Sequence, residues 1–197
     1  MPESIRRLIE SFKMLPGVGE KTAERLAFSI LDFDEDQVEL FSNSIVDVSN
    51  NIKKCKICNN LTEKDICDVC EDSTRNDELL CVVDDVKNIF IFEKMAMYNG
   101  LYHVLDGLIS PMDGINPEDI GLEKLIDRIQ NGNFSEVVFA FNPSIEAETT
   151  SMYIKRILSD TNIKFTRLAS GVPMGANMEY IDSLTLERAL SDRKEVE

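Results

Sequence analysis

The sequence of 197 residues contains no tryptophan, and His103 is its single histidine. It also lacks an apolar run of about 18 residues, the length that a membrane-spanning helix needs. The first residues, MPESIRRLIESFK, carry no apolar signal-peptide core. We therefore expect no membrane span and a location in the cytoplasm.

Two kinds of catalytic machinery are missing as well. No G-x-x-x-x-G-K-[ST] segment occurs, so the chain is not a self-sufficient P-loop ATPase. His103 has no evident nucleophile partner in the sequence, which argues against a His-based catalytic triad. We expect this histidine to be packed within a strand.

Basic residues are scarce, because 21 Lys and Arg stand against 36 Asp and Glu and give a net charge of -15. This acidic excess argues against nonspecific binding of polyanions by the whole surface. It leaves room for a local cationic site, since physiological salt screens charges that lie more than about 10 Å away. Residues 1–31 are close to neutral, with five basic and four acidic side chains.

A glycine turn between two expected helices, LPGVGEKTAERLAF at 15–28, is typical of a helix-hairpin-helix. Gly17 and Gly19 tolerate positive φ and carry no side chain that would block a close approach. Backbone N–H groups at the start of the second helix suit a phosphate, and Lys21 and Arg25, one turn apart, add positive charge. The motif predicts contacts to the DNA backbone; an ordinary helical hairpin is the alternative interpretation.

Four of the five cysteines form two C-x2-C pairs, Cys55 with Cys58 and Cys67 with Cys70. Four thiolates at this spacing are typical of a tetrahedral zinc site. Because they fill every coordination position, the predicted Zn²⁺ is structural, and its binding would fold a segment that has almost no core. Cys81 lies in the apolar run LLCVV and is expected to be a buried strand residue.

The rest of the chain alternates between strand and helix patterns. Apolar spacing predicts helices over 4–14, 20–33 and 35–52. From residue 79 a β-α-β-α order implies a parallel, right-handed α/β sheet. The expected strands are 79–84, 101–106, 136–141 and 164–170, and the expected helices are 85–96, 118–132 and one within 142–160.

Acidic residues follow two of these strands, Asp84 after the first and Glu146 and Glu148 after the third. Carboxyl ends of parallel strands form the ligand site of an open sheet, so these carboxylates could converge and bind Mg²⁺. The arrangement resembles a Toprim domain, with Asp84 in place of the usual glutamate and Glu-x-Glu in place of Asp-x-Asp. Both departures favour an acidic face for partner contacts over metal-dependent catalysis.

Together, the hairpin, the four cysteines, SPMDGINPEDIGLEKL, NPSIEAE and GVPMG before EYIDSLTL resemble the RecR family of bacterial recombination mediators over nearly the whole chain. The resemblance implies an adaptor without bond chemistry, assembled as a tetrameric ring or clamp through N-terminal and C-terminal contacts. It also implies that the chain works on duplex, gapped and single-stranded DNA in the bacterial nucleoid. Its implied partners are RecO and often RecF, with which it loads RecA onto DNA coated by SSB.

The resemblance also implies roles for single residues. Lys21 and Arg25 match the DNA-contacting cations of the hairpin, and the four paired cysteines match the zinc ligands. Glu146 lies in the segment that the family turns toward RecO. Asp182, at the end of MEYID, matches a Walker B-like motif at a subunit contact and, without a Walker A loop, is expected to be structural.

The predicted fold class is therefore a multi-module α/β protein. Its expected parts are a helix-hairpin-helix domain at 1–53, a four-cysteine zinc finger with linker at 54–78, a Toprim domain at 79–172 and a C-terminal oligomerisation segment at 173–197. The rival hypothesis is a Mg²⁺-dependent Toprim nuclease or a topoisomerase-like enzyme. A topoisomerase needs a nucleophilic tyrosine, and no recognisable strand-cleaving motif contains one of the four candidates, Tyr98, Tyr102, Tyr153 and Tyr180.

Overall fold

Residues 1–169 and 171–193 are described by the computed structural model, in which the chain divides into two units. The first unit is Met1–Ile52 and the second is Lys53–Glu197. Ser170, the last residue of an expected strand, and the end of the expected C-terminal segment at 194–197 lie outside the described residues. Within the described ranges, no helix is both long enough and apolar enough to cross a membrane.

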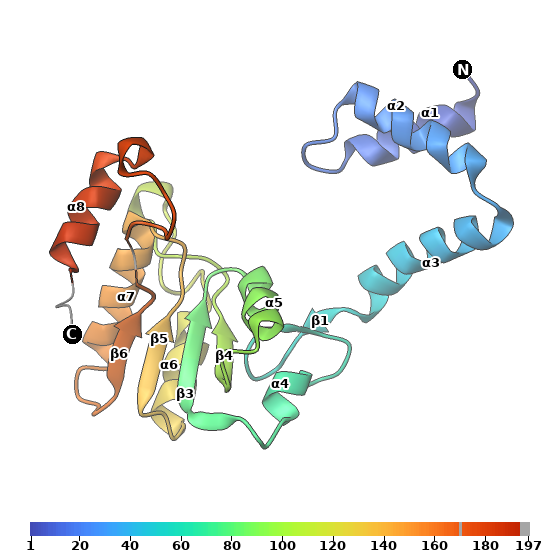
Figure 1. Ribbon diagram of the computed structural model, residues 1–197. Coiled ribbons are helices and arrows are strands. Elements are labelled where there is room, and N and C mark those ends of the chain that lie inside the picture. Colours follow the sequence, from blue (N-terminus) through green and yellow to red (C-terminus); the bar gives the residue numbers. More distant parts are fainter. Residues whose placement is uncertain (170, 194–197) are drawn as a thin grey trace. The chain divides into compact units, whose positions relative to one another are not determined.

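The first unit is helical, as the apolar spacing predicts (Figure 1). Its elements are α1 (Glu3–Lys13), α2 (Glu20–Ser29), the 3-10 helix η1 (Ile30–Asp32) and α3 (Glu35–Asn51). The expected second helix thus tightens to a 3-10 turn after Ser29. Asp34 begins α3 with a capping box, because its side chain accepts from Gln37 N at 2.8 Å while Gln37 Oε1 accepts from Asp34 N at 3.0 Å.

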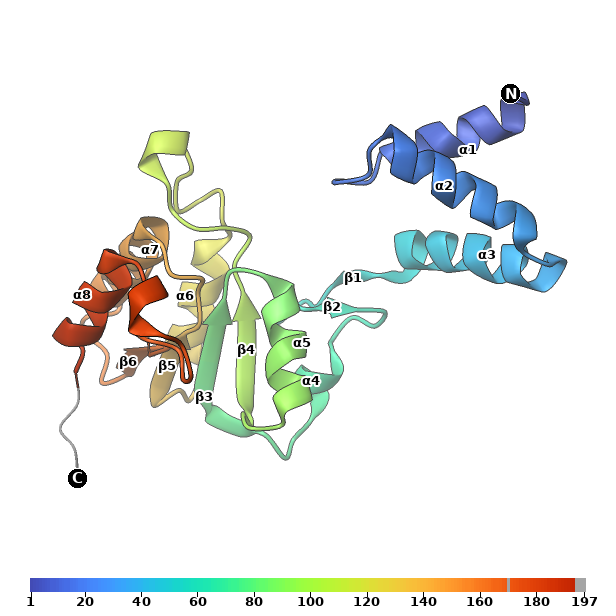
Figure 2. The ribbon, with the colours of Figure 1, turned by 45° about the horizontal axis from the view of Figure 1, so that its top comes forward.

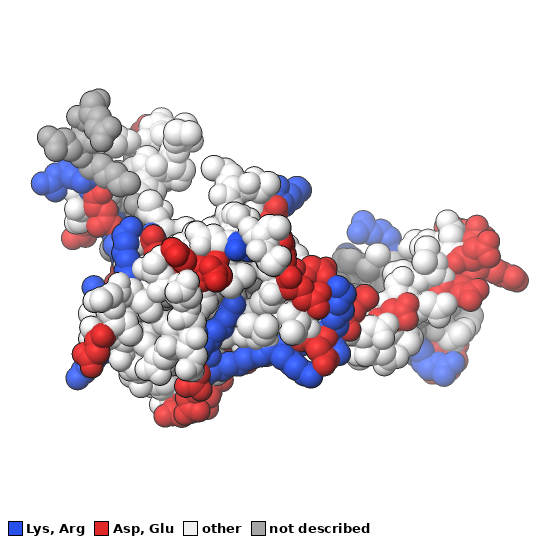
Figure 3. All heavy atoms as spheres, turned by 90° about the horizontal axis from the view of Figure 1, so that it is seen from below, with Lys and Arg blue, Asp and Glu red and all other residues white. Residues whose placement is uncertain are grey.

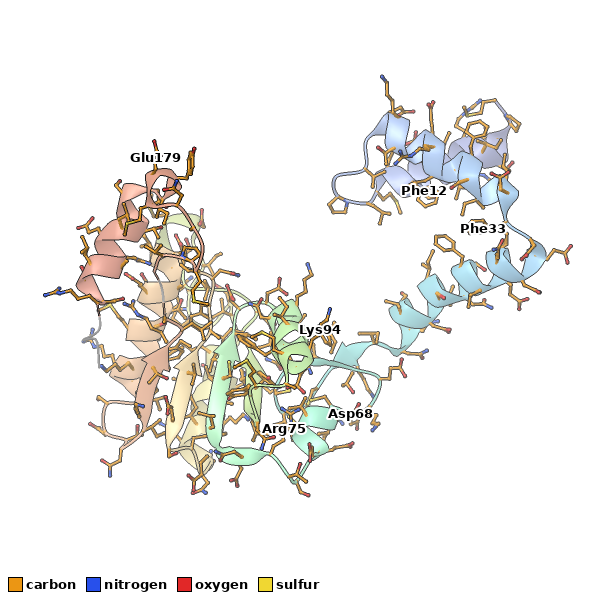
Figure 4. The ribbon with its side chains drawn as sticks, viewed as in Figure 1. Phe12, Phe33, Asp68, Arg75, Lys94 and Glu179 are labelled. Atoms are coloured by element: carbon orange, nitrogen blue, oxygen red, sulfur yellow. The ribbon has the colours of Figure 1, made fainter. Side chains whose placement is uncertain are left out.

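The core of the first unit is small and lies between α1 and α2. Ile9, Ala23 and Ala27 are buried, and the two alanines allow the helices to approach closely. Phe12, labelled in Figure 4, packs against this cluster with Ile5, Leu8 and Val18. In α3, by contrast, no residue is buried.

The second unit begins with a small cysteine-rich module at residues 53–75. It contains a two-stranded antiparallel ribbon, β1 (Lys53–Lys54) with β2 (Leu61–Thr62), and the one-turn helix α4 (Asp68–Glu71). Its buried apolar side chains are three of the four paired cysteines, and Asn59 and Asn60 are buried beside them. The module therefore has almost no apolar core apart from its cysteines.

The main sheet has four parallel strands, which confirms the α/β prediction. Its spatial order is β4-β3-β5-β6, so β3 lies inside the sheet and β4 and β6 form its edges. The bounds are β3 (Asn76–Val83), β4 (Gly100–Val104), β5 (Glu136–Phe139) and β6 (Lys164–Arg167). As expected, Cys81 is buried within β3.

Helices cover both faces of this sheet (Figures 1 and 2). On one face α5 (Val86–Met95) packs through Ile89 over Val83 and Tyr102. On the other face α6 (Leu122–Asn131) and α7 (Ile145–Ile157) pack over Val82 and Val137. The remaining elements are the 3-10 helices η2 (Pro111–Asp113) and η3 (Met178–Tyr180) and the helix α8 (Ser183–Ser191).

The expected helix at 118–132 begins four residues later than the sequence suggests. The α-helix starts at Leu122 because Gly121 adopts φ 67, which is left-handed backbone. Before it, Asn116 N donates to Asp119 Oδ2 at 2.8 Å, and Asp106 N donates to Ile120 O at 3.2 Å. The segment before Gly121 is therefore a turn that ties the loop to the end of β4.

His103 is completely buried in β4, as its strand pattern predicts. Its Nδ1 lies 3.3 Å from the Arg128 guanidinium, and its Nε2 has no hydrogen-bond partner within the described structure. Burial, reinforced by the charges of Arg128 and Lys124, lowers the pKa of His103 to about 3. The ring is therefore neutral at physiological pH.

This histidine should make the fold sensitive to mild acid. Its folded-state pKa lies below the unfolded value of about 6.5, so its contribution is complete above pH 6.5 and is lost as the pH falls toward 3. Between pH 7 and pH 5 we expect the free energy of unfolding to fall by about 2 kcal/mol more in the wild type than in His103→Gln. Urea unfolding of both proteins at pH 7 and pH 5 measures this difference. The other titrating groups are the same in the two proteins, so their contributions cancel. Parallel pH curves for the two proteins would contradict the expectation.

Candidate functional site

The turn between α1 and α2 uses a positive φ at only one of its two glycines. Gly17 adopts φ 81, whereas Gly19, the N-cap of α2, is extended with φ -84. Leu15 N donates to Phe12 O, and Val18 N donates to Leu15 O, each at 3.1 Å. A Cβ placed on Gly17 or Gly19 would meet no atom within 4 Å, so the backbone of the turn is open to an incoming ligand.

The start of α2 presents unpaired backbone donors. Gly19 has no side chain with which to cap the helix, and the first intrahelical bond in the described structure is Ala23 N to Gly19 O at 2.9 Å. The N–H groups of residues 20–22 therefore keep the positive end of the helix dipole without an internal partner. Such a helix start suits a phosphate oxygen.

Two cations stand beside these donors. Lys21 and Arg25 are exposed, and neither forms an ion pair with any residue in 1–169 or 171–193. Lys13, in contrast, is engaged by Glu20 at 2.7 Å and Glu10 at 3.0 Å, contacts that raise its pKa. Because Glu20 is held by Lys13, it competes less for the neighbouring Lys21.

The four paired cysteines meet in one place, as the spacing predicts. Their Sγ atoms all lie within 4.8 Å of one another, and Cys58 Sγ is 3.5 Å from Cys67 Sγ. Tetrahedral zinc with Zn–S bonds of about 2.3 Å requires sulfur atoms about 3.8 Å apart, so the donor set fits Zn²⁺. In the described part of the chain this is the only group of three or more His, Cys, Asp or Glu side chains that could hold a metal.

The local backbone prepares these sulfurs for a metal. Cys67 N donates to Cys55 Sγ at 3.3 Å, and Asn60 N donates to Cys58 Sγ at 3.5 Å. Hydrogen bonds from the Cys58 and Cys70 thiols lower the pKa of Cys67, and the hydrogen bond to Cys67 raises the pKa of Cys58. Since zinc binds thiolates, metal binding to this cluster would release protons.

Two of the acidic residues that follow the strands, Asp84 and Glu148, have different partners. Asp84 accepts from Asn142 Nδ2 at 3.2 Å and from Asn88 Nδ2 at 3.4 Å. Glu148 instead binds Arg188 at 2.6 Å and Arg167 at 3.3 Å. These arginines come from later in the chain, and they direct Glu148 toward α8 rather than toward Asp84.

A cavity of about 630 Å³ opens near these residues at the carboxyl ends of β5 and β6. Apolar side chains make up much of its wall, among them Phe139, Phe141 and Phe165. Glu148, Arg167 and Arg188 lie at the same cavity. The sequence patterns did not indicate this combination, because the two arginines had no recognisable motif.

Asp182 has a clear structural role in this chain. It is the N-cap of α8, accepting from Thr185 N at 2.9 Å and from Thr185 Oγ1 at 2.7 Å. These hydrogen bonds lower its pKa. The side chain thereby starts the helix that carries Arg188 to Glu148.

Comparisons with known proteins divide the chain in the same order as its modules. Family models match as follows: the RecR helix-hairpin-helix over residues 5–49, the RecR four-cysteine zinc finger domain over 52–72, the Toprim domain over 78–169 and the RecR C-terminal region over 171–194. The zinc finger match and the four-cysteine cluster together support zinc as a structural metal.

Whole-chain relatives agree with these matches. Proteins called "Recombination protein RecR" from Staphylococcus aureus strains Newman and USA300 are each 49% identical to this chain over 195 residues. The aligned region covers 99% of this chain and 98% of each relative. The chain therefore belongs to the RecR family of recombination proteins.

Proposed function

We propose that this chain is a DNA-binding clamp or adaptor that helps RecO and RecF to load RecA onto SSB-coated single-stranded DNA at gaps. Membership of the RecR family supports a role in recombinational repair. The observation that carries the more specific proposal is the hairpin turn, where an uncapped helix start and two exposed cations stand together. This arrangement grips phosphates and does not read bases, as an adaptor acting at any gap requires.

A homo-oligomer, in the form of a tetrameric ring, is part of the proposal. Val38, Phe41, Ile45 and Val48 of α3 recur at spacings of three and four residues and are all exposed. An apolar helical stripe that stays in water calls for a partner helix. Several hairpins in one particle would combine contacts that are individually weak.

The acidic second unit would serve partner proteins. Its cavity at the ends of β5 and β6 joins aromatic walls to charged side chains, which suits a protein contact. We assign this side, including Glu146, to RecO. Acidic and basic side chains are interspersed over the face seen in Figure 3, so partner choice would depend on local pairing. The proposed place of action is the bacterial nucleoid.

One incubation tests the adaptor against the rival enzyme. Labelled gapped duplex is mixed with the purified chain and Mg²⁺, and the sample is divided between a native and a denaturing gel. We expect a shifted band on the native gel and intact strands on the denaturing gel. Cut or covalently trapped strands that disappear in Glu146→Gln would instead identify a Toprim nuclease or topoisomerase.

A second arm tests the partner. Purified RecO is added to the gapped duplex with SSB, RecA and either the wild type or Glu146→Gln. We expect RecA filament formation to be faster with the wild type, and slower with the variant although DNA binding is equal. Equal RecA loading with and without this chain would contradict the adaptor proposal.

A further inference from the structure

The cysteine-rich module covers the open side of β4. Because β4 is an edge strand, the backbone groups on its outer side could pair with another chain. Instead, Val104 N donates to Cys58 O at 2.8 Å, and Val104 O accepts from Asn59 Nδ2 at 3.0 Å. Two residues earlier, Tyr102 O accepts from Arg128 at 2.6 Å. Outward-facing backbone groups of Tyr102 and Val104 are therefore hydrogen-bonded although no fifth strand is present.

Asn59 occupies an unusual place among these contacts. It follows the zinc ligand Cys58 directly, adopts φ 62 and is buried. Its Nδ2 reaches Val104 O, while its Oδ1 accepts from Lys124 Nζ of α6 at 2.5 Å. One amide thus joins the metal knuckle to the sheet edge and to a helix on the sheet. We call the Cys58 carbonyl, Asn59, Val104 and Lys124 the edge clamp.

The module is attached to the same strand at two further points. Arg75, labelled in Figure 4, donates to Glu93 Oε1 at 2.9 Å and to Gly100 O at 3.2 Å. Tyr102 donates its hydroxyl to the same Glu93 oxygen at 2.8 Å. At the other end of β4, Lys54 binds Asp106 at 2.5 Å. Both ends of the module are thus fixed to β4 or its end. The backbone around Cys58, between these ends, is the part whose position depends on the metal.

We infer that Asn59 is a positioning residue that couples zinc binding to the edge of the Toprim sheet. Bound zinc fixes Cys58, and the edge clamp passes that fixed position to Val104. In the opposite direction, Lys124 and Val104 hold Asn59 so that Cys58 stays in place for the metal. Hydrogen bonds outside the ligand shell orient metal ligands and are energetically coupled to metal binding. Here they act on the backbone of Cys58 and on its neighbour Asn59. Zinc loss should therefore open the β4 edge.

The test uses the full zinc-loaded chain with two variants that break the clamp from opposite sides. Asn59→Gly removes the amide and accommodates the left-handed backbone, and Lys124→Met removes the ammonium. The control is Lys64→Met, since Lys64 lies in the same module but binds Asp68 and Glu71 outside the clamp. Zinc transfer to a chelating dye and hydrogen exchange at the Val104 amide are measured for each protein.

We expect zinc transfer to be about 10-fold faster in both clamp variants, with the control unchanged. Exchange at Val104 should be faster in both clamp variants and in the zinc-free wild type, while the central strand amide of Leu80 stays protected. The double variant should be no worse than the more affected single variant, because both changes break one connection.

Three outcomes would overturn the inference. They are wild-type zinc transfer and Val104 exchange in Lys124→Met, an equal effect of Lys64→Met, and a Val104 amide that stays protected after chelation of zinc. Should Asn59→Gly fail to yield soluble protein, Lys124→Met and the zinc-free wild type still decide the question.

Discussion

Cys67→Ser should leave the chain without zinc and unfold the cysteine-rich module. Cys67 is buried, and its Sγ lies 3.5 Å from Cys58 Sγ. The fifth cysteine, Cys81, belongs to β3 and cannot replace it as a zinc ligand. The module contains almost no other core, and structural zinc contributes about 10 kcal/mol or more to folding of such segments. We expect no bound zinc by elemental analysis, a melting temperature at least about 10 °C lower and misassembly of the proposed oligomer by light scattering.

The matched control is Cys81→Ser, which makes the same chemical change in another buried cysteine. Cys81 should tolerate it with one full equivalent of zinc and the wild-type assembly, although burying a hydroxyl costs some stability. A soluble Cys67→Ser protein with the wild-type assembly and no zinc would show that the metal has no structural role. A fully loaded variant would show that a different ligand set holds the zinc.

Replacing both Lys21 and Arg25 by alanine should weaken DNA binding at every sequence. Both side chains are exposed beside the uncapped start of α2, and neither has an ion-pair partner among the described residues. Removing two phosphate contacts should lower affinity roughly 10- to 100-fold per engaged hairpin and reduce the slope of log K against log salt by about 2. Fluorescence anisotropy across a salt series, on two unrelated duplexes, measures both quantities.

Arg6→Ala with Arg7→Ala is the control for total charge. It also removes two positive charges from the first unit, but from α1 and away from the turn. We expect a clearly smaller loss of affinity and a slope close to that of the wild type. If this pair weakens binding as much as the Lys21 and Arg25 pair, diffuse charge and not the hairpin accounts for binding.

The fold could be predicted from the sequence because its signals are local. Apolar spacing marks the helices of the first unit, and short apolar runs mark all four strands. The late start of α6 was missed because one residue decides it, namely Gly121 with φ 67. The sequence EDIGLEKL is equally compatible with a glycine inside a helix and with a glycine in a turn before it.

The candidate sites, too, could be predicted only where their residues lie close together in the sequence. The hairpin turn and the four cysteines are such cases, so their patterns were sufficient to predict the helix-hairpin-helix and the sulfur cluster. The edge clamp and the pairing of Glu148 with Arg188 join residues that lie far apart in the chain. Single polar residues such as Asn59 carry no periodic signal, and only the folded chain brings their partners together.

The strand order β4-β3-β5-β6 has a consequence for the chain as it leaves the ribosome. One side of β3 can close as soon as Gly100–Val104 emerges, whereas the other must wait for Glu136–Phe139. At synthesis rates of about 5–20 residues per second, this delay lasts about 2 to 7 seconds. Of the two inner strands, β3 therefore waits longer for its second neighbour than β5 does, and this interval is when a chaperone would meet the nascent protein.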